Sequence, residues 1–176
     1  GEGNGGQDIY IAKRKKPGKV EGNRTKKSSP ELEWEKHVDT HNPRDVPHVN
    51  VNEGPEVLVH KNKIFLIYSA SGCWTDFYAL GMLTASAGDD LLNASSWKKS
   101  QQPVFKQSIE NGVYAPVHNS FFVSPGGKED WILYHANSKP GGGCGGFRSP
   151  RAQKFSWKQD GSPDFGIPVK EGVSMA

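Results

Sequence analysis

The sequence of 176 residues has no apolar run near the roughly 20 residues that a membrane-spanning helix needs, so we expect no membrane partner. No segment sustains the 3.6-residue apolar period of an amphipathic helix, which argues against a helical core. The opening residues, GEGNGG, hold neither an initiator methionine nor the apolar segment of a signal peptide. We therefore expect a helix-poor protein, present here as a processed chain or a fragment.

Cysteine is also scarce, which excludes a small fold stapled by several disulfides. The two cysteines, Cys73 and Cys144, either form one disulfide or remain as two separate thiols. Two N-glycosylation triplets, which begin at Asn23 and Asn93, are compatible with secretion. On this basis we expect an extracellular protein.

A large excess of charge of one sign is missing too. The net charge is only +3, and much of it comes from the run Lys13–Lys16 with Lys19. A nucleic-acid-binding protein would interleave such residues with aromatic side chains or align them along a helix. Here they flank Pro17 and Gly18, which favours a solvated turn, so we expect no nucleic-acid partner.

The sequence is rich in short runs of β-branched and aromatic residues, and turn residues separate these runs. The pairs Asn62–Lys63 and Gly126–Gly127 stand where tight hairpin turns belong. The pattern predicts an all-β protein with strands at Gln7–Ala12, Glu56–His60, Ile64–Ser69, Tyr78–Ala85, Trp97–Gln101, Asn119–Val123, Trp131–His135 and Arg151–Trp157.

The strands belong to a repeat with a period of about 60 to 70 residues. The stretch NEGPEVLVHKNKIFLIYSAS aligns with VHNSFFVSPGGKEDWILYHAN, which places Glu53 over His118. The stretch SSWKKSQQPVF aligns with FSWKQDGSPDF, which places Trp97 over Trp157 and marks both tryptophans as inter-strand core. Four antiparallel strands at a fixed period are typical of the blades of a β-propeller.

The repeat predicts one partial propeller domain over residues 1–176. We expect a partial blade and a connection over 1–50, a blade over 51–115 and a blade over 116–176, or roughly two and a half blades. Because a propeller closes its ring to remove exposed strand edges, this number predicts the C-terminal part of a longer protein or a need for a partner.

The repeat also explains a carboxylate at the start of an apolar strand. The first strand of a blade lines the central channel, so its leading residue lies at the channel mouth. Glu53 and His118 share that position in the alignment, and we expect both side chains at one axis. The alternatives are a solvated glutamate and a histidine that is hydrogen-bonded within its blade.

Four stretches of the chain form a more specific pattern: VNEGPEVL, KIFLIYSASGCWTDFYALGMLTAS, NGVYAPVHNSFFVSPGGKEDWILYHAN and GCGGFRSPRAQKFSW. Together they resemble glycoside hydrolase family 43, most of all its arabinofuranosidase-type members, from Asp8 to Val169. The resemblance implies a five-bladed β-propeller that cleaves arabinofuranosyl or xylosyl linkages in plant polysaccharide with inversion. It also implies an aspartate base, a second aspartate that tunes the acid, and a glutamate acid.

The resemblance assigns Glu53, in the EGP motif, as the general acid. His118, in the HNSF motif, falls under the sugar site, beside a structural calcium or its waters near the axis. No cofactor is required for the chemistry. The substrate-binding arginine falls on Arg148 or Arg151. Trp74, after a strand that leaves the axis, either walls a sugar subsite or packs within its blade.

Two departures from the family pattern bear on function. Both family aspartates fall before Gly1, and nothing in the chain replaces them, so we expect this chain alone to be incomplete for catalysis. Ala115 and Val117 replace the glycines that usually flank the family's proline. The alternative from another functional class is a non-catalytic propeller remnant that binds carbohydrate or protein.

Overall fold

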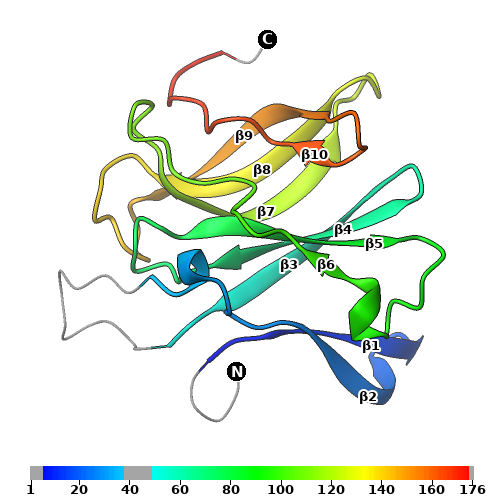
Figure 1. The fold of residues 1–176 in the computed structure, drawn as a ribbon. Coiled ribbons are helices and arrows are strands. Elements are labelled where there is room, and N and C mark those ends of the chain that lie inside the picture. Colours follow the sequence, from blue (N-terminus) through cyan, green and yellow to red (C-terminus); the bar gives the residue numbers. More distant parts are fainter. Residues whose placement is uncertain (1–5, 38–48, 175–176) are drawn as a thin grey trace.

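The structure, a computed structural model, describes residues 6–37 and 49–174 (Figure 1). In this part of the chain, three antiparallel sheets are stacked one above another, and the only helices are two short 3-10 turns. None of these helices has the length and apolar character needed to cross a bilayer. The arrangement is the predicted all-β one.

The central sheet holds four strands in the order β3-β4-β5-β6, with bounds Asn52–His60, Lys63–Ala70, Ala79–Ser86 and Lys98–Lys99. The 3-10 turn η2, Ala94–Ser96, precedes β6. Strand β4 reads KIFLIYSA, and its residues from Phe65 to Ala70 are all buried. Phe65 and Ile67 belong to one core cluster and Leu66 and Tyr68 to the other, because side chains alternate between the faces of a strand.

The upper sheet in Figure 1 repeats this meander in the order β7-β8-β9-β10, with bounds Tyr114–Val123, Asp130–Asn137, Arg148–Trp157 and Pro163–Asp164. The larger core cluster joins it to the central sheet and includes Leu80, Val117 and Ile132. Full burial of one such side chain stabilises a fold by about 1.5–3 kcal/mol. The two sheets therefore have the form and the packing of adjacent propeller blades.

The third sheet is a hairpin of β1, Ile9–Lys16, and β2, Lys19–Ser28. It joins the central sheet through the parallel bridge between Gln7 and Val51, and the 3-10 turn η1, Glu33–Glu35, follows it.

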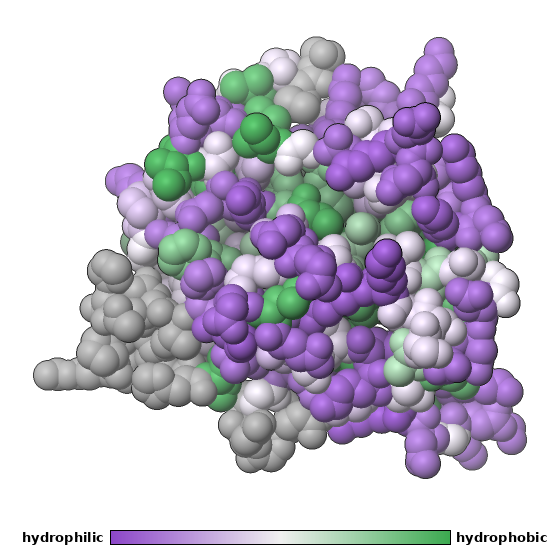
Figure 2. Space-filling model, viewed as in Figure 1, coloured by the Kyte–Doolittle hydropathy of each residue, from purple (hydrophilic) through white to green (hydrophobic). Residues whose placement is uncertain are grey.

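In the view of Figure 2, polar residues cover most of the surface and apolar residues form small separate patches.

Two details differ from the sequence-based predictions. The run Lys13–Lys16 is the end of β1 rather than part of the turn, and Lys13 lies 3.6 Å from Glu21 on β2. Trp97 and Trp157 are not equivalent, because Trp97 lies just before β6 whereas Trp157 ends β9. Both tryptophans pack against core residues, but the connection before β6 is longer than the one before β10.

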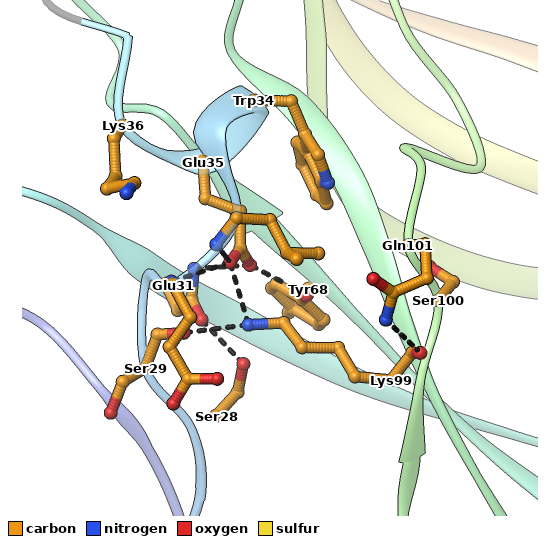
Figure 3. A network of polar contacts seen from close by, with 12 residues as sticks. Ser28, Ser29, Glu31, Trp34, Glu35, Lys36, Tyr68, Lys99, Ser100 and Gln101 are labelled. Atoms are coloured by element: carbon orange, nitrogen blue, oxygen red, sulfur yellow. Dashed lines mark hydrogen bonds and ion pairs between the residues drawn. The ribbon is translucent and has the colours of Figure 1, made fainter.

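A buried carboxylate ties η1 to the central sheet (Figure 3). Glu35 is fully buried, and its Oε2 accepts a hydrogen bond from Lys99 Nζ at 2.7 Å. Its Oε1 accepts from Tyr68 Oη at 2.9 Å and from Asn52 Nδ2 at 3.1 Å. Two backbone N–H groups, those of Glu31 and Leu32, complete the set. A buried charge is tolerated when it is paired and hydrogen-bonded in this way.

We expect Glu35→Gln to lower the free energy of unfolding by about 3–5 kcal/mol, because it leaves the ammonium of Lys99 without its buried counter-charge. Urea unfolding measures the change. The matched control is Glu33→Gln in the same 3-10 turn, where the carboxylate side chain is 94% exposed and pairs with Lys36. That control should leave stability nearly unchanged. Equal effects of the two substitutions would contradict the role given to Glu35.

Candidate functional site

Glu53 lies at the start of the inner strand of the central sheet, next to a β-bulge. The pairing of β3 with β4 shifts between Glu53 and Glu56, and Gly54 adopts a φ of 56°. A bulge of this kind bends the strand and redirects the neighbouring side chain. Glu53 is half-buried, and its carboxylate points to a tyrosine rather than to bulk water.

That tyrosine is Tyr78, which immediately precedes β5. Its hydroxyl donates a hydrogen bond to Glu53 Oε1 and lies 2.9 Å from His118 Nδ1. Burial, followed by the charge of Glu53, raises the pKa of Tyr78 far above its ordinary value. One buried phenol therefore connects the predicted acid to the predicted axial histidine.

His118 lies in a bulge within β7, the inner strand of the upper sheet. Its φ is 50°, and the pairing of β7 with β8 shifts between Val117 and Ser120. When the two strands are aligned at their bulges, Gly54 of β3 occupies the same position as His118 of β7. The predicted alignment of Glu53 with His118 is therefore wrong by one residue. Glu53 corresponds instead to Val117. An alignment of side-chain types cannot locate a bulge to the residue.

Gly54 is needed for both its conformation and its size. A Cβ at this position would lie 3.2 Å from His118 Cδ2 and 3.3 Å from its Nε2. The ring of His118 can thus approach the bulge of the neighbouring sheet because the side chain of residue 54 is absent. The backbone N–H of His118 donates to Ser69 Oγ at 3.0 Å, which fixes the histidine from its other side.

A second histidine and an arginine extend the site. The ring of His135 stacks on that of His118 with centroids 5.2 Å apart. Arg148 Nη1 donates to His135 Nδ1 at 3.0 Å and to the carbonyl of Ala115 at 3.0 Å. Burial, then the positive charge of Arg148, lowers the pKa of His135 to about 4. His135 is therefore neutral at neutral pH, and the site carries its positive charge on Arg148.

The structure separates the two arginines between which the sequence could not decide. Arg148 lies 5.4 Å from the ring centroid of Tyr78 and donates to the carbonyl of Cys73 at 3.1 Å. Arg151 instead donates to Ser138 Oγ at 2.7 Å and lies 3.5 Å from Glu171, near the C-terminal segment. Only Arg148 is thus placed beside Glu53 and His118 through direct contacts with their partners.

Two loops close around this arginine. Cys73 and Cys144 form a disulfide, which decides between the two thiol states that the sequence allowed. Asp76 accepts hydrogen bonds from the backbone N–H of Gly141, at 3.0 and 2.9 Å. Trp74 is half-buried and its ring lies over Gly72, where a Cβ would come within 2.4 Å of it.

Sequence reasoning missed Tyr78, His135 and the loop contact of Asp76. Tyr78 had one usable signal, because it stands just before a strand that leaves the same end of the blade as Glu53. His135 had none, since a histidine in the middle strand of a blade is ordinary. No group of three or more His, Cys, Asp or Glu side chains suited to a metal ion occurs within residues 6–37 and 49–174.

Comparison with known proteins is consistent with this arrangement. The family model described as glycosyl hydrolases family 43 matches residues 1–163. An extracellular exo-α-(1→5)-L-arabinofuranosidase of Streptomyces avermitilis is 45% identical over 170 residues, which cover 94% of this chain and 33% of the relative. α-L-Arabinofuranosidase 43 of Humicola insolens is 39% identical, with 93% and 33% coverage.

Solved structures that this chain resembles belong to similar enzymes. The α-L-arabinofuranosidase from Lactobacillus brevis is 34% identical with a TM-score of 0.83, over 95% of this chain and 49% of that one. A thermostable family-43 glycoside hydrolase is 25% identical with a TM-score of 0.77, over 96% and 50%. The chain thus spans about a third of the length of the curated relatives and forms part of a five-bladed β-propeller. It belongs to glycosyl hydrolase family 43.

Proposed function

We propose that this chain carries the acid side of an inverting, exo-acting glycoside hydrolase. The enzyme would remove α-L-arabinofuranosyl, or β-xylosyl, residues from plant cell-wall polysaccharide. One observation carries the proposal: the half-buried carboxylate of Glu53 is held by Tyr78 beside His118 and Arg148. The names of two relatives, which are arabinofuranosidases, support arabinose as the sugar.

In this mechanism Glu53 protonates the glycosidic oxygen as the bond to the leaving group breaks. Its Oε1 is engaged by Tyr78, which leaves Oε2 to face the substrate. Arg148 keeps its charge, and one N–H on Nη2 remains for a sugar hydroxyl after its other donors bind protein acceptors. Trp74, which follows Cys73 in the chain, offers an aromatic face. Arg151 would not reach the same sugar, so we assign the substrate contact to Arg148.

Inversion also needs a base that activates water on the opposite face of the sugar, with the two carboxyl groups roughly 6.5–9.5 Å apart. The family resemblance places that aspartate outside residues 1–176. We infer that the base belongs to a part of the propeller that the relatives contain and this chain does not span.

Secretion is a further part of the proposal. The relative of Streptomyces avermitilis is named extracellular, and a disulfide such as Cys73–Cys144 persists in oxidising compartments. A water-mediated calcium contact at His118 stays a prediction. It would have to use Nε2, because Nδ1 is engaged by Tyr78, and calcium prefers oxygen ligands that this group of residues supplies sparsely.

Glu53→Gln tests the acid role in a complete protein that contains residues 1–176. We expect hydrolysis of arabino-oligosaccharides to fall by about 10²–10⁴-fold with little loss of affinity, because glutamine cannot donate a proton. Glu56→Gln is the matched control, since Glu56 is an exposed carboxylate on the same strand. Unchanged turnover in Glu53→Gln would rule out the proposed mechanism.

Residues 1–176 alone should bind arabino-oligosaccharide but release no product from an aryl arabinofuranoside, because the base is missing. Calorimetry and a colorimetric assay on the same preparation measure both properties. Turnover that disappears in Glu53→Gln would reveal a base within the chain. A complete protein that binds the sugar but never hydrolyses it would favour the non-catalytic remnant.

The neutral state of His135 predicts a pH dependence of stability. Its pKa is about 4 in the fold and near 6.5 when unfolded, so the unfolded chain takes up a proton first as the pH falls. The stabilisation is complete above about pH 6.5 and decreases toward pH 4. Because the ring is half-buried, we expect about 1–2 kcal/mol after screening by water.

Urea unfolding of the wild type and of His135→Gln at pH 7 and pH 4.5 measures this contribution. The wild type should lose more stability than the variant over this interval. The control is His60→Gln, which removes a histidine stacked on Trp157 and should leave the wild-type dependence in place. The same pH dependence for wild type and His135→Gln would show that His135 does not carry the effect.

A further inference from the structure

The hydroxyl of Tyr78 has two hydrogen-bonding neighbours but only one proton to donate. A phenol has one O–H, and this one meets both Glu53 Oε1 and His118 Nδ1 within hydrogen-bonding distance. Because burial keeps the pKa of Tyr78 far above its ordinary value, the phenol stays protonated at neutral pH. Tyr78 can therefore donate to only one neighbour, and the other must donate to the oxygen of Tyr78.

The neighbours determine which way the proton points. An ionised Glu53 can only accept, so Tyr78 donates to it and His118 must carry its proton on Nδ1. The ring nitrogen Nε2 of His118 faces Gly54. On the adjacent ring, Arg148 donates to Nδ1 of His135, so His135 carries its proton on Nε2. The two stacked histidines thus differ at Nδ1, which carries a proton in His118 and accepts a hydrogen bond in His135.

We propose that Tyr78 is a positioning residue that aims the proton of the catalytic acid, through a chain of hydrogen bonds from His118 Nδ1 to Tyr78 to Glu53 Oε1. This inference rests on the proposed function of Glu53. With Oε1 accepting from Tyr78, a proton taken up by Glu53 resides on Oε2, the oxygen that this hydrogen bond leaves available to a substrate. His118 acts through Tyr78, because its Nδ1–H prevents the phenol from turning away from Glu53.

The chain of hydrogen bonds also links the inner strands of the two blades, β3 and β7. Glu53 lies on β3 and His118 on β7, and each is displaced from regular strand geometry by its own bulge. Tyr78 enters from the loop between β4 and β5 and is fully buried. A rigid phenol in this position fixes the distance and direction of the acid before a sugar arrives, which is the requirement for efficient proton transfer.

The direct test is the tautomer of His118, measured by ¹⁵N NMR of the imidazole rings in the complete protein at neutral pH. We expect His118 protonated on Nδ1 and His135 protonated on Nε2. In Tyr78→Phe the preference of His118 for Nδ1 should be lost, whereas Tyr134→Phe should leave it unchanged. Tyr134 is the matched control, because its buried hydroxyl donates to Gln153 at 3.0 Å in the upper sheet. A wild-type His118 that carries its proton on Nε2 and none on Nδ1 would overturn the proposal.

The kinetic test compares two leaving groups in the same complete protein. Loss of acid orientation should slow kcat for a (1→5)-linked arabino-oligosaccharide by about 10–100-fold. An arabinofuranoside of an acidic nitrophenol leaves without full protonation, so Tyr78→Phe should slow its hydrolysis by no more than about threefold. Equal loss on both substrates would show that Tyr78 is merely structural.

Glu53→Gln measured beside these variants separates the two hypotheses. If Glu53→Gln retains full activity on the oligosaccharide, the proposed function itself is wrong. If Glu53→Gln is inactive and Tyr78→Phe behaves as wild type on both substrates, the acid stands and the role of Tyr78 is refuted. If Tyr78→Phe shows no cooperative thermal unfolding, and is therefore not folded, the protonation of Nδ1 of His118 in the wild type still decides the proposal.

Discussion

The hydroxyl of Tyr78 is the contact on which the site depends. It meets Glu53 from the central sheet and His118 from the upper one, so it defines how the two blades face each other at their inner strands. The sheets themselves are held together by apolar packing, which favours closeness but has no direction. A hydrogen bond has direction, and this one fixes the orientation of the carboxylate that we propose as the acid.

The central sheet has a second tyrosine in a comparable position on its other face. Tyr68 donates to the fully buried Glu35, as Tyr78 donates to Glu53, and each carboxylate stands at a junction between the sheet and its neighbour. Their surroundings differ. Glu35 is enclosed by five donors, including Lys99, and has no access to water, whereas Glu53 is half-buried. The same pair of residue types thus forms an enclosed structural anchor in one place and a partly exposed carboxylate in the other.

The sequence predicted the strands, the repeat and the closeness of Glu53 and His118 because each follows a local rule. Alternation, turn residues and the Gly-Pro pair after Glu53 are visible without coordinates. The alignment of the repeat was wrong at the bulges. The extra residue in each bulge makes His118 equivalent to Gly54 rather than to Glu53. Local rules also failed for Glu35 and His135, whose roles depend on neighbours more than ten residues away in the chain. Ala115, which takes a φ of 51° where the family pattern has glycine, shows that the backbone shape can persist without its usual residue.

The disulfide does more than join two loops. Arg148 donates to the carbonyl of Cys73 and, through Nε, to that of Gly143, so both of these acceptors stand at or beside a bridged cysteine. The covalent link limits how far the carbonyls can separate, and their separation sets where the guanidinium rests. The sulfur–sulfur bond therefore governs the placement of a positive charge, and reduction of the disulfide would free the guanidinium of Arg148 to move.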